Sequence, residues 1–198
     1  MIIDYKSSAK VLDPLYLAHG LQLQLPAYLA FLRRLPGAQK FFGVDKLVPA
    51  GVFYVNLRGE FSGGKTRTEV LDGAKEARRN AYQHAGRFDC SSLPYLDNRK
   101  ATSGTQFNYR LKNDGQPHGS SREIMTAEDF SALLDQVEQH LIRMGNEIFS
   151  GVAKVDPYQK GTARACDQCD YASICRIDPW THEYRILKKT SPTPHSSR

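Results

Sequence analysis

The hydrophobic pattern at the start of the chain predicts a strand, a helix and a second strand. Residues 1–6 form a short apolar run that ends in polar residues, as in a buried strand whose end reaches solvent. Apolar residues then recur at helical spacing over 15–35, although Pro26 allows a kink or a later start near Gln24. Residues 47–57 are rich in β-branched and aromatic side chains, which favours a strand. This order indicates a parallel pair of strands joined by a right-handed crossover.

The rest of the chain is predicted to contain a helix, a β region and a second helix. A polar, helix-capable segment covers 66–87, and its apolar stripe is thin. Residues 105–111 alternate like a strand, turn at Asn-Asp-Gly and return through 124–125, which favours a hairpin with a long loop. An amphipathic helix follows, with Thr126 as its N-cap, and Gly151 ends it. The pattern therefore predicts an α/β fold.

Composition and charge narrow the classes of protein. The chain has 198 residues, 40% of them hydrophobic, and a formal net charge of +6, which favours a polyanionic partner such as nucleic acid. No apolar run approaches the roughly 18 residues that cross a bilayer, and the start of the chain lacks the features of a secretion signal. We therefore expect a cytoplasmic protein without a membrane partner.

Three of the four cysteines crowd into ten residues. Cysteines in a reducing compartment do not usually form disulfides, so the clustering of Cys166, Cys169 and Cys175 indicates a metal site. Cys90 lies far upstream in a polar stretch and is expected to be a free thiol. From the residues alone, His182 could complete a Cys3His zinc site.

Two pairs of polar residues could carry chemistry. Asp4 and Lys6 leave the end of the first strand on the same face, about 7 Å apart along the backbone. There a carboxylate could hold a divalent cation while a lysine offsets phosphate charge; the simpler alternative is a surface ion pair. Gln24 and Tyr28 stand one helical turn apart and could reach the same cleft, although such residues are usually ordinary helix surface or core.

These motifs together resemble a known family. The segment Ile2-Ile3-Asp4-Tyr5-Lys6-Ser7 and, further on, Gln24 with Tyr28 resemble the (D/E)-X-K and Gln-X-X-X-Tyr motifs of the RecB family of PD-(D/E)XK nucleases. The segment 166–178 resembles the cluster-binding tail of the AddB-type subunit of bacterial ATP-dependent helicase-nucleases. The resemblance implies a restriction-endonuclease-like fold, with a mixed sheet flanked by helices and a Cys-rich segment at the C-terminus.

The resemblance also implies an activity. It is metal-dependent, exonuclease-type hydrolysis of DNA phosphodiester bonds in recombination and double-strand-break repair, alongside a helicase partner subunit. Asp4 would hold Mg2+ or Mn2+, Lys6 would stabilise charge or orient water, and Gln24 and Tyr28 would support the DNA. The chain contains no Gly-X4-Gly-Lys-(Ser/Thr) motif, so ATP hydrolysis would come from elsewhere. The candidate contacts to DNA phosphates are Arg33, Arg34 and Lys40.

The family holds a [4Fe–4S] cluster with four cysteines, three of them at the spacing of Cys166, Cys169 and Cys175. The fourth, upstream cysteine has no counterpart here, and Cys90 is only a conceivable substitute. Zinc with His182 stays open as an alternative.

A second departure concerns the metal site, since the family's other carboxylate would precede Met1. We therefore expect 1–160 to be the C-terminal part of a nuclease core, 161–187 a Cys-rich segment and 188–198 a disordered tail. One carboxylate alone should bind Mg2+ weakly. The rival hypothesis is a non-catalytic DNA-binding or assembly module with a structural zinc or iron–sulfur site.

Overall fold

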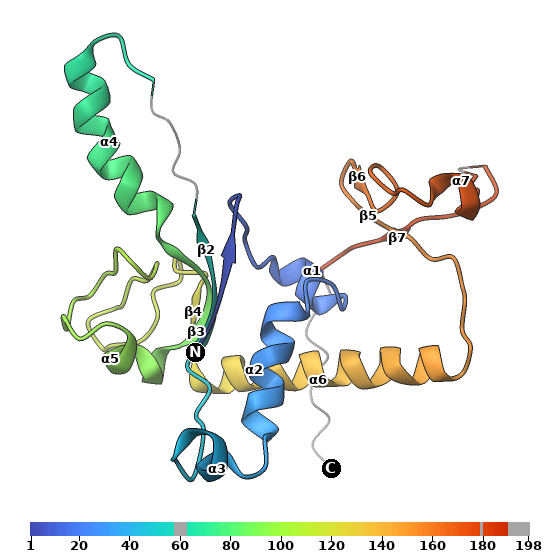
Figure 1. Cartoon of the computed structure of the whole chain (residues 1–198), viewed down its shortest axis with the longest axis horizontal. Helices are drawn as coiled ribbons and strands as arrows, with labels where there is room; N and C mark the ends of the chain where they lie inside the picture. The colour runs from blue at the N-terminus through green and yellow to red at the C-terminus, as the bar shows by residue number, and fades with distance from the viewer. Residues whose placement is uncertain (58–62, 179, 190–198) are drawn as a thin grey trace.

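The structure, a computed structural model, describes residues 1–57, 63–178 and 180–189 (Figure 1). Its centre is a four-stranded sheet in the order β1-β2-β3-β4. Strands β1 (Ile2–Lys6) and β2 (Gly51–Asn56) are parallel, β3 (His84–Asp89) runs antiparallel to β2, and β4 (Ile124–Met125) runs parallel to β3. The mixed sheet and the parallel first pair confirm the predicted fold class.

One face of the sheet is covered by helices α2 (Gln24–Arg34) and α6 (Ala127–Phe149). Alternate residues of the strands point toward them, so Ile2, Val52 and Tyr54 pack with the apolar stripes of both helices. Thr126 caps α6 by accepting a hydrogen bond from the Asp129 N–H at 3.1 Å, as its sequence predicts. Burial of this shared apolar face is what fixes α2 against the end of β1.

The first predicted helix is divided in two. Helix α1 (Pro14–Ala18) ends at a turn in which Gly20 and Gln22 both have positive φ, and α2 begins at Gln24. A single helix over 15–35 is therefore wrong, and the alternative start near Gln24 is confirmed. Pro26 lies in the first turn of α2, where backbone N–H groups have no partner within the helix, so it breaks no hydrogen bond.

The opposite face of the sheet is covered by the segment between β3 and β4. This segment contains the short helices η1 (Cys90–Ser92) and α5 (Leu93–Leu96) and long loops. Its buried side chains pack on two strand residues, Phe53 and Phe88, with the rings of Phe53 and Phe107 only 5.0 Å apart. The sheet is thus enclosed on both faces, by helices on one and by an aromatic cluster on the other.

Two predictions for the middle of the chain are wrong. The helix expected over 66–87 is α4 (Arg67–Ala81), and the residues after it form β3. The hairpin between 105–111 and 124–125 is absent, because β4 pairs with β3 and the 105–111 segment makes only isolated bridges. The Asp-Gly turn itself is present, with Gly115 at φ 79° and a bridge between Leu111 and Pro117. Both errors come from strand pairing between distant segments, which overrides local propensity.

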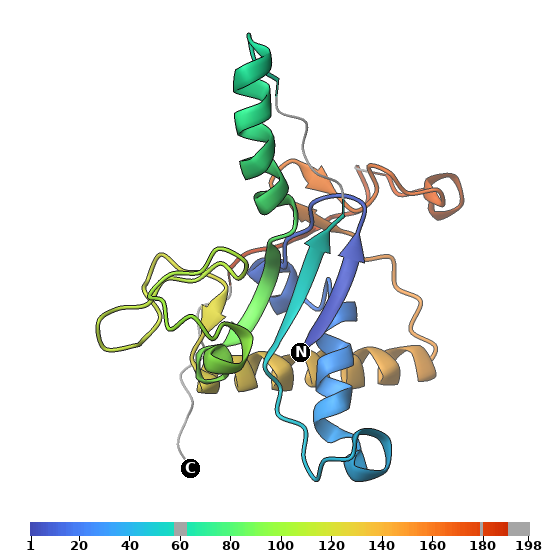
Figure 2. The same cartoon turned by 60° about the vertical axis from the view of Figure 1, so that its left-hand side comes forward.

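Two parts of the described chain extend from this core: helix α4 and the segment after α6. Helix α4 stands away from the sheet in both views (Figure 1, Figure 2). After α6, the chain forms a small sheet in the order β6-β5-β7, made of Ala163–Arg164, Tyr158–Lys160 and Arg185–Ile186. Helix α7 (Ala172–Cys175) lies beyond it. The small sheet contacts the core through an ion pair between Lys160 and Asp13 and an edge-on contact between the rings of Tyr16 and Tyr158.

The tail predicted to be disordered lies, from residue 190 on, outside the described residues. Among the helices that the structure describes, none combines the length and the apolar character that crossing a membrane requires.

Candidate active site

Asp4 and Lys6 lie together at the carboxyl end of β1. The Lys6 Nζ is 2.8 Å from the Asp4 Oδ2, and both side chains are partly exposed. Because Ile2 packs in the α2-side cluster and side chains alternate along a strand, Asp4 and Lys6 project from that same face. An acid and a lysine are therefore held side by side at a sheet edge, beside a helix.

Strand β2 adds two residues that sequence reasoning missed. In the parallel register, Tyr54 lies beside Asp4 and Asn56 beside Lys6. The Lys6 Nζ lies 5.6 Å from the centre of the Tyr54 ring, whose pKa is raised by burial. In a parallel pair, residues in register face the same way, so the alternation of Val52, Tyr54 and Asn56 could have identified both residues.

The ion pair sets the charge state of Lys6. Its hydrogen bond to Asp4 raises the pKa of Lys6 above the usual value, and the negative charge of Asp4 acts in the same direction. The lysine is therefore a fixed positive charge at neutral pH. It is suited to offsetting a negatively charged ligand and not to acting as a base.

Gln24 and Tyr28 form a second pair on α2. The Gln24 Nε2 donates a hydrogen bond to the Tyr28 hydroxyl at 3.0 Å. The helix that carries this pair packs against β1, the strand that carries Asp4 and Lys6. The shared cleft and the catalytic roles of the four residues stay predictions.

The three candidate DNA contacts differ in their surroundings. Arg33 is 2.7 Å from Asp135 and 2.5 Å from Glu138, and Arg34 is 3.1 Å from Glu138, so both arginines tie α2 to α6. Lys40, on the short helix α3 (Ala38–Phe42), is exposed. The structure thus gives Arg33 and Arg34 a packing role, and contact with DNA stays a prediction for all three.

The residues at the β1 end fit a divalent metal only in part. Asp4 offers hard carboxylate oxygens, which Mg2+ prefers, and Lys6 already holds a positive charge against one of them. Within 1–57, 63–178 and 180–189, no three His, Cys, Asp or Glu side chains gather as a metal-binding group. Asp4 therefore fits one ligand of such a site, and the described residues do not complete it.

The Cys-rich segment does not present a formed metal site either. Cys169 and Cys175 are exposed, Cys166 is half-buried, and the His182 Nδ1 accepts from the Asp178 N–H at 3.2 Å. As placed in the described part of the chain, these side chains do not form a shared ligand set. A [4Fe–4S] or zinc centre at this segment stays a prediction.

Cys90 lies far from the other cysteines. Its neighbour α5 and the helix α7 that ends at Cys175 are on opposite sides of the molecule in both views (Figure 1, Figure 2). The Cys90 Sγ donates to the Gly115 carbonyl at 3.6 Å, in the wall of a pocket of about 640 Å³. This position agrees with a free thiol and does not support Cys90 as a ligand shared with Cys166.

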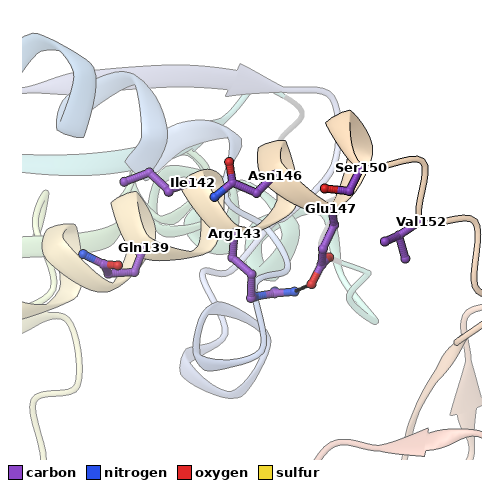
Figure 3. Close-up of a pocket in the computed structure, with 7 residues that line it drawn as sticks. All are labelled: Gln139, Ile142, Arg143, Asn146, Glu147, Ser150 and Val152. Atoms are coloured by element: carbon purple, nitrogen blue, oxygen red, sulfur yellow. Dashed lines mark hydrogen bonds and ion pairs between the residues drawn. The ribbon is translucent and has the colours of Figure 1, made fainter.

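A further hollow, of about 410 Å³, runs along the C-terminal half of α6 (Figure 3). Arg143 and Glu147 point toward each other in it, one turn apart, with 2.7 Å between Nη1 and Oε1. Such a pair on one helix face is usual on solvated helices. The hollow lacks the site residues of β1 and α2, so it is not part of the candidate active site.

Comparison with known families decides the classification. Residues 1–176 match the model of the PD-(D/E)XK nuclease superfamily, which covers the sheet, both flanking helices and the Asp4-Tyr5-Lys6 segment. The chain belongs to the PD-(D/E)XK nuclease superfamily. The resemblance seen in the motifs is thereby confirmed for the whole described core.

Similar proteins include three that are named as B-type subunits of an ATP-dependent helicase/deoxyribonuclease. The chain is 30% identical over 192 residues to the one from Alkaliphilus metalliredigens, covering 95% of this chain and 16% of the relative. It is 31% identical over 181 residues to the one from Moorella thermoacetica, covering 90% of this chain and 15% of the relative. It is 30% identical over 198 residues to the one from Bacillus anthracis, covering 94% of this chain and 16% of the relative. The chain thus spans less than a fifth of the length of these relatives.

Proposed function

We propose that the chain carries the catalytic strand of a metal-dependent, exonuclease-type deoxyribonuclease that works in bacterial recombination and double-strand-break repair. The observation that carries this proposal is the Lys6–Asp4 pair at the strand end, on the strand against which α2 with its Gln24–Tyr28 pair is packed. Membership of the nuclease superfamily and similarity to helicase/deoxyribonuclease proteins support the choice of DNA as the substrate.

In this proposal Lys6 and Asp4 act through their charges, and Gln24 and Tyr28 act by positioning the DNA. Lys6 places a permanent positive charge where negative charge develops on a phosphate during hydrolysis. Gln24 and Tyr28 offer an amide and a hydroxyl that position the DNA strand next to that charge. Asp4 supplies one carboxylate toward Mg2+ or Mn2+, which when bound would polarise a water molecule and a phosphate oxygen.

Two further features belong to the proposal. The relatives' names include an ATP-dependent helicase, so we infer that a helicase partner feeds DNA to this domain. We also infer that Cys166, Cys169 and Cys175 bind a [4Fe–4S] cluster or, with His182, a zinc ion. Because these side chains do not form a ligand set as placed, binding would require the segment 161–187 to rearrange.

The test is a cleavage assay on labelled DNA with Mg2+ or Mn2+. Asp4→Asn and Lys6→Ala should each lower the rate by at least about 100-fold, because each removes a charge used in the transition state. The matched control is Glu147→Gln, which breaks an exposed ion pair on α6. Full activity in both site variants would refute the proposal. DNA binding without metal-dependent cleavage by the wild-type chain would favour a binding module.

A further inference from the structure

Exposed aromatic rings follow α2 away from the candidate active site. Gln24, Tyr28 and Phe31 are spaced i, i+4 and i+7, so they form one stripe on the helix. The Tyr28 and Phe31 side chains are 51% and 65% exposed, on the side of α2 opposite its buried residues. The stripe begins at the Gln24–Tyr28 pair, on the helix that packs against β1, and continues toward the C-terminal end of the helix.

Helix α3 extends the stripe beyond α2. Gly37, with φ 73°, turns the chain after α2, and α3 then lies at the end of that helix in both views (Figure 1, Figure 2). Phe41 and Phe42 of α3 are 64% and 53% exposed. The Lys40 Nζ lies 5.9 Å from the centre of the Phe41 ring. A ring and an ammonium group are thus presented together at the far end of α2.

Four exposed aromatic side chains on two consecutive helices are not the usual solvent-facing composition of helices. Lys40 lies against the Phe41 ring, Lys46 is exposed in the loop that follows α3, and Lys6 is on the strand against which α2 packs. Asp45 is the exposed acidic residue in that loop. A surface that combines flat rings with flanking positive charges matches unpaired nucleotides, whose bases stack while their phosphates take cations.

We propose that Tyr28, Phe31 and Phe41 form a base-stacking track for single-stranded nucleic acid that leads to the Asp4–Lys6 site, with Lys40 contacting a phosphate. The inference rests on the proposed nuclease function. At 1.5 Å per residue, the 11 residues of α2 span about 16 Å, which is room for a few stacked bases. The track extends the site beyond the motif residues, since neither Phe31 nor Phe41 belongs to a motif.

The test measures binding of a labelled oligothymidylate of about 15 nucleotides to the full chain by fluorescence anisotropy, in EDTA so that cleavage cannot interfere. Phe31→Ala and Phe41→Ala should each weaken binding at least about five-fold, the low end of a lost base–aromatic stack. Both rings are exposed, so folding should be unchanged, and circular dichroism and thermal melting check this. Lys40→Ala should lower the slope of log affinity against log salt by about 0.7.

The matched controls are Tyr95→Ala and Phe149→Ala, which remove rings that are 91% and 95% exposed elsewhere on the molecule. They should leave binding unchanged. Equal losses in the controls and the track variants, or unchanged binding in Phe31→Ala and Phe41→Ala, would overturn the track. Track variants that keep DNA binding but lose association with a helicase partner would instead assign this surface to a protein, which also overturns it.

The result is independent of catalysis. If the wild-type chain fails to cleave but its binding depends on Phe31 and Phe41, the nuclease proposal fails and the track stands. If cleavage depends on Asp4 while binding is unchanged in Phe31→Ala and Phe41→Ala, the nuclease proposal stands and the track fails.

Discussion

The Asp97 carboxylate accepts several hydrogen bonds that favour its charged state. Arg99 donates to it through Nε at 2.8 Å and Nη2 at 2.6 Å, and the Tyr109 hydroxyl donates at 2.9 Å. Arg99 thereby holds the pKa of Asp97 well below its usual range, although the carboxyl group is almost completely buried. This network anchors the loop after α5 to the aromatic cluster beneath the sheet.

We predict that Asp97→Asn lowers the free energy of unfolding by about 1–3 kcal/mol at pH 7, as expected for the loss of charged hydrogen bonds in a buried site. A depressed pKa stabilises the fold above the unfolded value of about 4, and the effect is lost as pH falls toward the folded value. The difference between wild type and variant should therefore shrink between pH 4 and pH 2. Urea unfolding at each pH measures it, with Asp45→Asn as the exposed control; a difference independent of pH would contradict the assignment.

At the residue scale, the sequence was informative where the relevant contact is local. The Asp4–Lys6 and Gln24–Tyr28 pairs follow from the period of a strand and of a helix, so spacing alone placed each pair on one face. The partners of Arg33 could not be predicted, because Asp135 and Glu138 lie more than 100 residues further along the chain.

Among the elements, β3 depends on a close approach to β2 that only glycine permits. A Cβ atom at Gly86 would lie 1.8 Å from the Val52 carbonyl oxygen. We predict that Gly86→Ala destabilises the protein by more than about 3 kcal/mol, since the backbone of β2 or β3 must move. For a chain of this length, that corresponds to a fall of at least about 6 °C in Tm.

The control is Gly145→Ala in the interior of α6, where an added Cβ meets nothing within 4 Å. It should raise the stability by about 0.5–1 kcal/mol, because alanine is the better helix former. Thermal melts of the two variants with the wild type settle both predictions. A tolerated alanine at position 86 would mean that the β2–β3 pairing is not as described.

The contact between α2 and α6 gives a further prediction at this scale. The Arg33 and Glu138 side chains are only 16% and 22% exposed. A double-mutant cycle with Arg33→Met and Glu138→Gln should therefore give a coupling energy of about 1–2 kcal/mol, above the values for exposed pairs. The matching cycle at Arg143 and Glu147, both well exposed on one helix, should give about 0.3–0.5 kcal/mol. Equal coupling in both cycles would show that Arg33 does not clamp the helices.

The same elements show what periodicity can predict. Helix α6 and the parallel β1–β2 pair carry long or strongly apolar patterns, and both were predicted. Strand β3 was missed because its polar sequence is helix-compatible and its conformation is decided by pairing with β2. The strands β5, β6 and β7 have only two or three residues each, too few for a period to be visible.

For the molecule as a whole, the Cys-rich segment is the part whose order should respond to metal. We predict that protein prepared without oxygen is brown, with broad absorbance near about 400 nm if a cluster forms, and that Cys169→Ser removes the colour. Colourless protein with about one zinc per chain, lost in His182→Ala, would indicate the zinc alternative. Hydrogen exchange should slow across 158–187 when metal is bound.

Cys90→Ser is the control and should change neither the colour, nor the zinc content, nor the hydrogen exchange. Cys90 packs with the aromatic cluster and not with the Cys-rich segment. Protein that takes up neither iron nor zinc under these conditions would remove both metal hypotheses for the segment.

The contact at Asp13 has a mechanical consequence. Its carboxylate accepts from the Leu15 N–H to start α1 and also binds Lys160 of the small C-terminal sheet, while its own N–H donates to the Gln22 side chain, two residues before α2. Asp13 therefore connects the C-terminal segment both to the start of α1 and to the turn that precedes Gln24. Movement of the C-terminal segment would therefore act first on the residue that also holds the turn before the helix carrying Gln24 and Tyr28.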